Sequence, residues 1–176
     1  MRKIVYYVAI STDGYIAGPD GDISKFVANG KGVQKYLKDL KGFDTVIMGK
    51  NTYELGYSFG MKPGENPYPH MRCYVVSDSL KLEQGPSDIN IVSLDLNFIR
   101  QLKDQEGTDI YLCGGGMLAG WLLENDMVDS LKLKINPILL KTGIRLFGSS
   151  KKRFHLDLKN CQIFNDIQVN EYDIQY

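Results

Sequence analysis

The chain has 176 residues, of which 43% are hydrophobic, and its 21 basic and 21 acidic residues give a formal net charge of zero. The length fits one domain spanning residues 1–176, and the zero net charge argues against a nucleic-acid-binding protein, whose surface is usually strongly basic. The longest stretch without a charged residue, 110–123, is interrupted by glycines and is shorter than the ~20 apolar residues of a membrane span. Without a signal-peptide pattern or metal-ligand spacing of the cysteines, we expect a cytoplasmic protein with no membrane association and no metal site.

The first half of the chain alternates between apolar runs and one amphipathic segment. Continuous apolar runs at 4–10 and 45–48 predict strands that are buried on both faces. Between them, apolar residues spaced three and four apart predict a helix over 32–40. Asn51 is expected to cap a short helix that ends at Leu55, and the Gly- and Pro-rich stretch 56–70 reads as a long loop.

The second half continues this alternation and ends differently. Further strands are predicted at 73–77, 89–92, 110–113 and 130–140. A helix is predicted to begin near Asp95, with Leu94 and Leu102 on its apolar face. A second helix is predicted after the three glycines 114–116, and Met127 could extend its apolar face. Two antiparallel strands, 154–161 and 167–176, are expected to meet around Asn165 and Asp166. Together these patterns predict an α/β domain whose sheet is mostly parallel, with an antiparallel edge.

The run Gly114-Gly115-Gly116 is the strongest local signal, because it lies between a predicted strand and a predicted helix. Glycines in this place let a phosphate approach the backbone, and the helix N-terminus offers free N–H groups and the positive end of its dipole. The ordinary alternative is a tight strand-to-helix turn that binds nothing. The run does not match the GxGxxG dinucleotide fingerprint.

Two further predicted strands end in residues that suit a phosphate. Gly49-Lys50-Asn51-Thr52 follows one strand, and Ser77 ends another. Lys50 and Thr52 could hold a phosphate, or Lys50 could simply be a solvated lysine at a helix start. Ligands of open α/β sheets bind outside the carboxyl ends of the strands, so three such ends together indicate a ligand site.

The ordered set of motifs resembles the dihydrofolate reductase superfamily. The matching segments are Ala9-x-Ser11-x-Asp13-Gly14-x-Ile16-Ala17, Val46-Ile47-Met48-Gly49-Lys50-x-Thr52-Tyr53-Glu54, Val75-Val76-Ser77 and Gly114-Gly115-Gly116, followed by Asn136-Pro137-Ile138-Leu139 and Gly143-Ile144-Arg145-Leu146-Phe147. The chain is most similar to the riboflavin-biosynthesis branch, which comprises the reductase domain of the bifunctional pyrimidine deaminase/reductase and its stand-alone relatives. This resemblance implies a three-layer fold with a sheet of about eight strands, an antiparallel C-terminal hairpin and helices on both faces.

The resemblance also implies hydride transfer from NADPH. Its pattern assigns Ala9 and Ile16 to the nicotinamide and Ser77 to the adenosine 2′-phosphate. Cofactor phosphates are assigned to Gly49, Lys50, Thr52, Gly114, Gly115, Gly116, Met117 and Leu118. Asp78 follows Ser77 where an arginine often stands, so NADH is not excluded. The helix carboxylate that anchors folate would fall near Val33, which has no acidic neighbour, so dihydrofolate reduction is not expected.

The reaction also needs a proton and a substrate pocket. Asp13 is the first candidate for a proton donor, although Asp-Gly is also a common turn, and Glu54 is the second, with a solvated carboxylate as its alternative. Tyr57 and Phe59 could line the pocket or pack the loop onto the core. The leading hypothesis is a reductase of a ribosylaminopyrimidine or another small carbonyl or imine. The alternatives are a reductase of an unrelated substrate and a non-catalytic nucleotide-binding or interaction protein. A homodimer through the C-terminal strands is expected from the resemblance.

Overall fold

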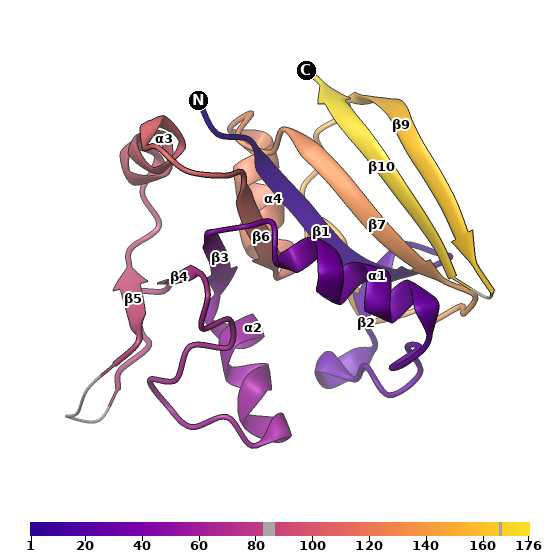
Figure 1. The fold of residues 1–176 in the computed structure, drawn as a ribbon, viewed down its shortest axis with the longest axis horizontal. Coiled ribbons are helices and arrows are strands. Elements are labelled where there is room, and N and C mark those ends of the chain that lie inside the picture. Colours follow the sequence, from indigo (N-terminus) through magenta and orange to yellow (C-terminus); the bar gives the residue numbers. More distant parts are fainter. Residues whose placement is uncertain (83–86, 166) are drawn as a thin grey trace.

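The computed structural model describes residues 1–82, 87–165 and 167–176, and its centre is an eight-stranded sheet (Figure 1). The strands lie in the order β5-β4-β3-β6-β1-β7-β10-β9. Their bounds are β1 Ile4–Ser11, β3 Thr45–Gly49, β4 Arg72–Val76, β5 Ile89–Val92, β6 Ile110–Gly114, β7 Ser130–Asn136, β9 His155–Phe164 and β10 Ile167–Gln175. A second, small sheet pairs β2 (Tyr15–Ala17) with β8 (Ile144–Arg145).

The directions of the strands divide the large sheet into two parts. Neighbouring strands from β5 to β7 are parallel, whereas β10 runs antiparallel to β7 and β9 runs antiparallel to β10. The turn between β9 and β10 follows Phe164, where Asn165 has a positive φ of 53°. The predicted mostly parallel sheet with an antiparallel hairpin at its edge is therefore confirmed.

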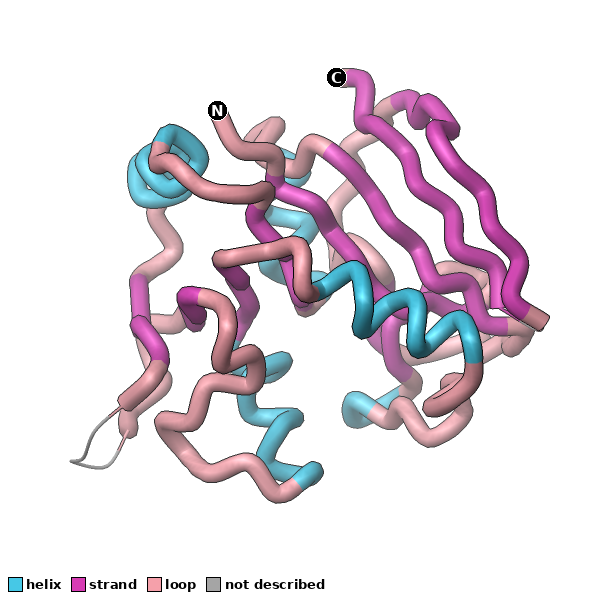
Figure 2. Tube along the Cα trace, in the orientation of Figure 1, coloured by secondary structure: helices cyan, strands magenta, loops and turns pink. Residues whose placement is uncertain are grey.

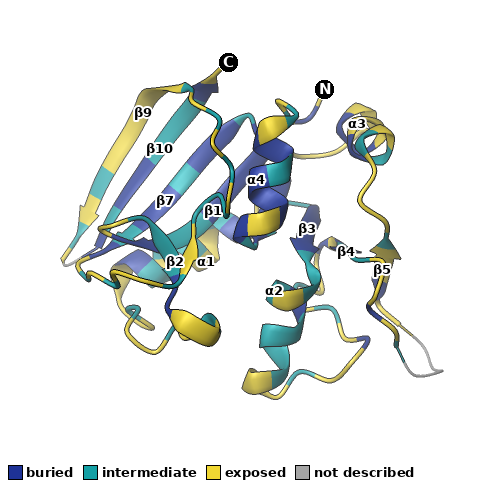
Figure 3. Ribbon diagram, turned by 180° about the vertical axis from the view of Figure 1, so that it is seen from behind, coloured by how far each residue is buried: buried dark blue, intermediate teal, exposed yellow. Residues whose placement is uncertain are grey.

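Helices cover both faces of this sheet, as Figures 1 and 2 show. They are α1 (Lys31–Leu40), α2 (Lys50–Leu55), α3 (Leu96–Asp104) and α4 (Gly116–Glu124), with short 3-10 turns at Pro19–Gly21 and Gly56–Phe59. Helix α1 crosses in front of β1 and β7, and α4 lies behind the sheet, where Figure 3 views it directly. None of the helices in the described part of the chain has the length and apolar character needed to cross a membrane.

Because successive strand residues point to opposite faces, the sheet separates two cores. On β1, Ile4 and Tyr6 pack with residues of α3 and α4, whereas Tyr7 packs on the side of α1 and α2. On β6, Leu112 and Tyr111 divide in the same way. Each large apolar side chain that is fully buried contributes about 1.5–3 kcal/mol, so continuous apolar strands are what this two-sided sheet requires.

Some predicted boundaries are wrong, for identifiable reasons. Strand β7 stops at Asn136 rather than Leu140, because the buried Asn136 side chain bonds to backbone groups and Pro137 follows it. Gly49, not Asn51, stands at the N-cap of α2. Leu94 lies before α3 and is exposed, although Asp95 does cap that helix by accepting a hydrogen bond from Asn97 N at 3.0 Å. Met127 lies beyond the end of α4.

Candidate functional site

The three phosphate-friendly segments of the sequence lie at one edge of the sheet. Strands β4, β3 and β6 are parallel neighbours, so their carboxyl ends meet there. Strand β3 ends at Gly49 and leads directly into α2, β4 is followed by Ser77, and β6 ends at Gly114 and leads into α4. The sequence expectation that these segments come together therefore holds for their positions; their binding roles stay predictions.

The glycines allow the turns after β3 and β6 to approach closely. A methyl group on Gly115 would lie 2.9 Å from Thr52 Oγ1, and one on Gly114 would lie 3.7 Å from the same atom. Gly114 has a φ of +133°, which side-chain-bearing residues rarely adopt. The Gly114–Gly115 peptide is cis. Thr52 on α2 thus touches the backbone of the glycine run, and the two turns form one surface.

Lys50 extends this surface toward the end of β4. Its Nζ lies 3.3 Å from Ser79 Oγ and 3.8 Å from Glu54 Oε1. Ser77 Oγ accepts hydrogen bonds from the backbone N–H groups of Ser79 and Leu80, at 3.1 and 2.9 Å. The segment after β4 is therefore held as a tight turn with the Ser79 hydroxyl beside the Lys50 ammonium group, an arrangement that suits a phosphate.

The N-terminus of α4 supplies the backbone donors of this edge. Gly115 is the N-cap residue, and none of the described side chains caps the helix. The first turn carries no acidic residue, so the positive end of the helix dipole is not offset. Met117 is 74% exposed in this turn, whereas Leu118 is buried in the core. The N–H groups of the first turn can hydrogen-bond to an anion.

At the carboxyl end of β1, Asp13 anchors a distant loop. Its carboxylate accepts hydrogen bonds from Ser11 Oγ at 2.6 Å, Leu140 N at 3.1 Å and Lys141 N at 2.7 Å. These bonds, of which the one from Ser11 is the strongest influence, lower the pKa of Asp13 to about 2. The carboxylate is ionised at neutral pH and holds no proton to donate, which favours the turn-residue alternative. Ile16 on β2 is half-buried against the core.

The other predicted site residues belong to the segment around α2. Glu54 is half-exposed and lies beside Lys50. Tyr57 packs edge-on against Tyr53 with ring centroids 5.6 Å apart, and burial raises the pKa of its hydroxyl. Phe59 is 70% exposed. Tyr57 thus helps to pack the loop onto the core, as the ordinary alternative had it, and a substrate contact of either ring stays a prediction.

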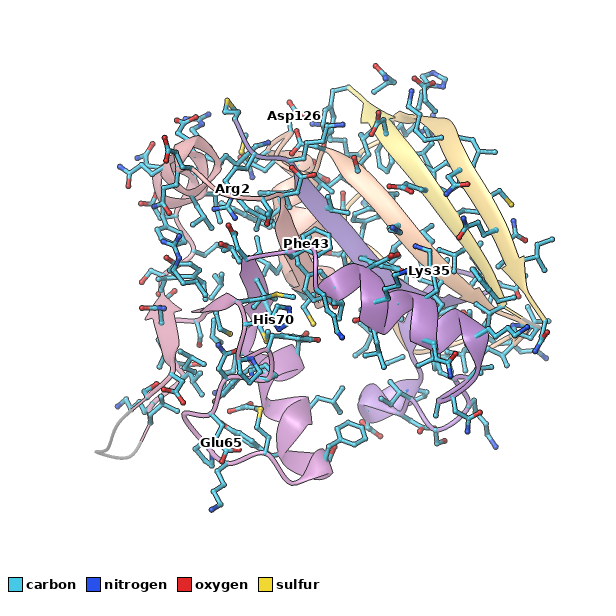
Figure 4. The ribbon with its side chains drawn as sticks, in the orientation of Figure 1. Arg2, Lys35, Phe43, Glu65, His70 and Asp126 are labelled. Atoms are coloured by element: carbon cyan, nitrogen blue, oxygen red, sulfur yellow. The ribbon has the colours of Figure 1, made fainter. Side chains whose placement is uncertain are left out.

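Charged groups that the sequence did not single out lie between α1 and the sheet. Asp39 on α1 accepts hydrogen bonds from Lys35 at 2.5 Å and Tyr7 Oη at 3.3 Å and is ion-paired with Lys132 of β7 at 2.8 Å. Partial burial opposes its ionisation, yet the two lysines hold the pKa of Asp39 below its ordinary value. Lys134, two residues after Lys132 and on the same side of β7, is 7% exposed. Figure 4 shows Lys35 on α1, in front of β1 and β7.

Tyrosine hydroxyls line the neighbouring part of the same face. Tyr36 Oη and Tyr111 Oη are 2.5 Å apart, and Tyr68 Oη lies 3.5 Å from Cys113 Sγ. Burial raises the pKa of the Cys113 thiol, and the residue is half-buried, so Cys113 acts as a small apolar side chain. No cluster of metal-ligating side chains occurs among residues 1–82, 87–165 and 167–176.

An open hollow of about 300 Å³ lies beside Asp13. Its lining includes Tyr15, Arg145 and Phe147, from β2 and the segment around β8. Arg145 brings a positive charge to this hollow, and no sequence motif had pointed to it as a site residue. The hollow does not include the glycine run or Lys50, so it adjoins the phosphate-friendly edge without being part of it.

Comparison with known proteins agrees with this architecture. Residues 2–169 match the family model described as the RibD C-terminal domain. The uncharacterised Bacillus subtilis protein YwjB is 32% identical over 164 residues, which cover 93% of this chain and 92% of that protein.

Two solved structures share the fold. A Shewanella sp. PV-4 protein assigned to riboflavin biosynthesis has a TM-score of 0.82 at 24% identity, with both chains fully covered. The Thermotoga maritima diaminohydroxyphosphoribosylaminopyrimidine deaminase/5-amino-6-(5-phosphoribosylamino)uracil reductase has a TM-score of 0.72 at 16% identity, covering 98% of this chain and 56% of that one. At these identities the likenesses show the fold alone.

Proposed function

This chain belongs to the RibD C-terminal domain family, and from that premise we propose that it is an NAD(P)H-dependent reductase of a small carbonyl or imine substrate. The observation that carries the proposal is the convergence of three strand ends at one edge of the sheet. There Gly49–Thr52, Ser77 and Gly114–Leu118 combine an ammonium, hydroxyls and free helix N–H groups. We also propose that the protein is located in the cytoplasm.

The residues at this edge fit a dinucleotide cofactor. The first turn of α4 offers N–H donors to a pyrophosphate, and Lys50 offers positive charge. Gly49 leaves open the space beside the turn, since a methyl group there would meet no atom closer than 3.8 Å. Ser77 and Ser79 are the hydroxyls available to a 2′-phosphate, and NADPH is therefore the proposed cofactor. The negative charge of Asp78 would repel the 2′-phosphate, so NADH is the alternative cofactor.

In the proposed mechanism, the bound nicotinamide supplies the hydride. Ala9, on β1, offers a small, half-buried surface for the reactive ring. Asp13 acts as a positioning residue, because its ionised carboxylate holds the backbone of Leu140 and Lys141 beside the end of β1. Glu54 remains the carboxylate proposed as a proton donor. Tyr57 is proposed to support the substrate side of the loop.

The substrate proposed first is 5-amino-6-(5-phosphoribosylamino)uracil, which is the compound named for the reductase of the Thermotoga protein. The alternatives are an unrelated carbonyl or imine and a non-catalytic, nucleotide-binding role. The test is to follow NADPH oxidation by the purified protein with this pyrimidine and with a panel of simple aldehydes and imines. Turnover of the pyrimidine alone supports the first substrate, and turnover of other compounds alone supports the second. Cofactor binding without any turnover supports the non-catalytic role.

We also propose that the protein forms a homodimer through β9. Among the described strands, this edge strand pairs only with β10. It exposes Leu156, Leu158 and Ile163 by 40, 58 and 74%, and its ribbon is mostly yellow in Figure 3. Asp157 and Lys159 flank Leu158, so antiparallel pairing of two copies about Leu158 would place opposite charges face to face. Sedimentation of the wild type and of Leu158→Lys tests this: a dimer that becomes a monomer supports it, and a monomeric wild type contradicts it.

A further inference from the structure

Lys134 is a buried cation that has no counter-ion among the described residues. Its residue is 7% exposed, and its Nζ takes part in none of the ion pairs or hydrogen bonds found in the described part of the chain. The comparably buried Lys103 is bonded to Asp129 at 2.7 Å, and Lys132 is paired with Asp39 at 2.8 Å. Burial alone lowers the pKa of Lys134. Lys134 Nζ does not belong to the fully enclosed atoms that lack a hydrogen-bond partner, so the ammonium keeps some contact with solvent. A lysine buried to this extent is usually paired, so the missing partner calls for a cause.

The fold places this ammonium between the sheet and α1. Lys134 pairs with Ala9 of β1 on one side and with Val169 of β10 on the other. Val169 belongs to the core on the α1 side, and Lys134 Nζ lies 5.4 Å from the centre of the Tyr36 ring of α1. Residues that face each other across a ladder project from the same side of the sheet. Lys134 therefore lies on the same face as Ala9.

The charged groups on this face leave an excess of positive charge. These groups are Lys35 and Asp39 of α1, Lys132 and Lys134 of β7, and Glu171 and Asp173 of β10. Asp173 is balanced by Lys3, whose Nζ lies 3.4 Å from it. Asp39 is shared by Lys35 and Lys132, and Glu171 lies 3.9 Å from Lys132. All three carboxylates are thus engaged by lysines other than Lys134.

The start of α1 adds to this positive field. Its N-cap, Gly30, provides no side-chain cap, and its first turn contains no acidic residue. Gly32, in that turn, packs against Ile167 of β10, since a methyl group there would lie 3.1 Å from Ile167 Cβ. The positive end of the helix dipole therefore faces the same strand that flanks Lys134.

We propose that Lys134 binds an oxygen anion of the substrate, a carboxylate or a phosphate, on the α1 side of strands β1 and β7. The anion supplies the missing counter-charge, and it fixes one end of the substrate on the face where Ala9 would meet the nicotinamide. Tyr36 stacks beneath the ammonium and limits its direction. The assignment to the substrate, rather than to any small anion, rests on the proposed reductase function.

The test is a calorimetric titration with two anionic probes and their neutral counterparts, ribose 5-phosphate against ribose and benzoate against benzamide. The wild type is expected to bind at least one anion at millimolar concentration and to bind its neutral counterpart at least about tenfold more weakly. Lys134→Met should lose that preference, whereas Lys38→Met, on the exposed side of α1, should keep it. Binding of ribose 5-phosphate alone identifies a phosphate ligand, and binding of benzoate alone identifies a carboxylate. Equal binding by wild type and Lys134→Met, or no anion binding by the wild type, overturns the proposal.

Thermal unfolding of the same variants shows whether a loss of anion binding comes from a destabilised fold rather than from the missing ammonium. Methionine preserves most of the apolar length of lysine and removes the uncompensated charge, so Lys134→Met should melt at the same temperature as the wild type or higher. A markedly lower melting temperature would mean that the ammonium is a structural partner and would overturn the proposal. NADPH titration of both proteins separates the two hypotheses. If anion binding depends on Lys134 but NADPH does not bind, the ion site stands and the reductase function fails.

Discussion

Replacement of Gly49 by alanine separates the proposed binding role of the glycine from its structural role. Gly49 has extended backbone angles, φ −80° and ψ 162°, that any residue can adopt. The added methyl group would lie 3.8 Å from Gly115 N and 3.9 Å from Leu118 Cβ, which are ordinary contacts. The free energy of unfolding should therefore fall by no more than ~1 kcal/mol, the usual cost of an alanine at an N-cap. That corresponds to a melting temperature lower by ~2–4 °C.

The same methyl group would stand where the proposed cofactor phosphates approach the turn. NADPH affinity should consequently drop at least about tenfold, or ~1.4 kcal/mol. The matched control is Gly116→Ala, whose methyl group would lie 2.2 Å from Arg145 O and would displace the segment around β8. Overpacking costs ~1–3 kcal/mol, and Gly116, as the first residue of α4, gains little of the helix propensity that alanine brings to a helix interior. Its melting temperature should therefore fall by about 2–12 °C.

The assays are thermal unfolding followed by intrinsic fluorescence and titration with NADPH at a temperature where all three proteins are folded. The reasoning is refuted if Gly49→Ala binds NADPH as tightly as the wild type while it remains folded. It is also refuted if Gly116→Ala melts at the wild-type temperature, since the close contact with Arg145 would then be absent.

Three further substitutions test individual side chains. Hydrogen bonds from Ser11 and the backbone lower the pKa of Asp13 from 3.8 to about 2, so its stabilisation is complete above pH ~4 and is lost as the pH falls through 2. The melting temperature of the wild type should accordingly fall more steeply than that of Asp13→Asn over this range, and parallel curves would argue against the Asp13 bonds. Lys50→Met should weaken NADPH binding and reduce its dependence on salt, as measured by titration at several ionic strengths; an unchanged salt dependence would remove Lys50 from the phosphate site. Asp78→Asn should strengthen the binding of NADPH but not of NADH, and an equal change for both would show that Asp78 does not face the 2′-phosphate.

The regular part of the fold could be predicted because its signals are strong and local. Strands buried on both faces require continuous apolar residues, and β1, β3 and β6 have them. Asp95 marks the start of α3 because its carboxylate satisfies a free N–H group of the first turn. By contrast, β2 and β8 contain three and two residues, too few to show any periodicity. Their pairing depends on contacts between distant parts of the chain.

The candidate site shows the same division. The glycine run and Gly49 could be placed at one edge because each follows a predicted strand of a mostly parallel sheet, and the carboxyl ends of parallel strands lie at the same edge. Lys132 and Lys134 could not, since they alternate with Leu131 and Leu133 and such a strand normally turns its lysines to solvent. Helix α1 covers that face instead, so that Lys134 is buried and Lys132 is partly covered. Which face of an alternating strand a helix will cover is decided by tertiary packing.

The central claim is that the carboxyl edge of β3, β4 and β6 binds a reduced nicotinamide dinucleotide, and titration of the wild-type protein with NADPH and NADH tests it most directly. The account predicts saturable binding of NADPH, visible as a change in cofactor fluorescence, with weaker binding of NADH. Preference for NADH would still support a dinucleotide site at this edge, but Ser77 would then have no 2′-phosphate to bind and Asp78 would no longer oppose the cofactor. Binding of neither dinucleotide at millimolar concentration would contradict the claim and leave the fold without a cofactor site at this edge.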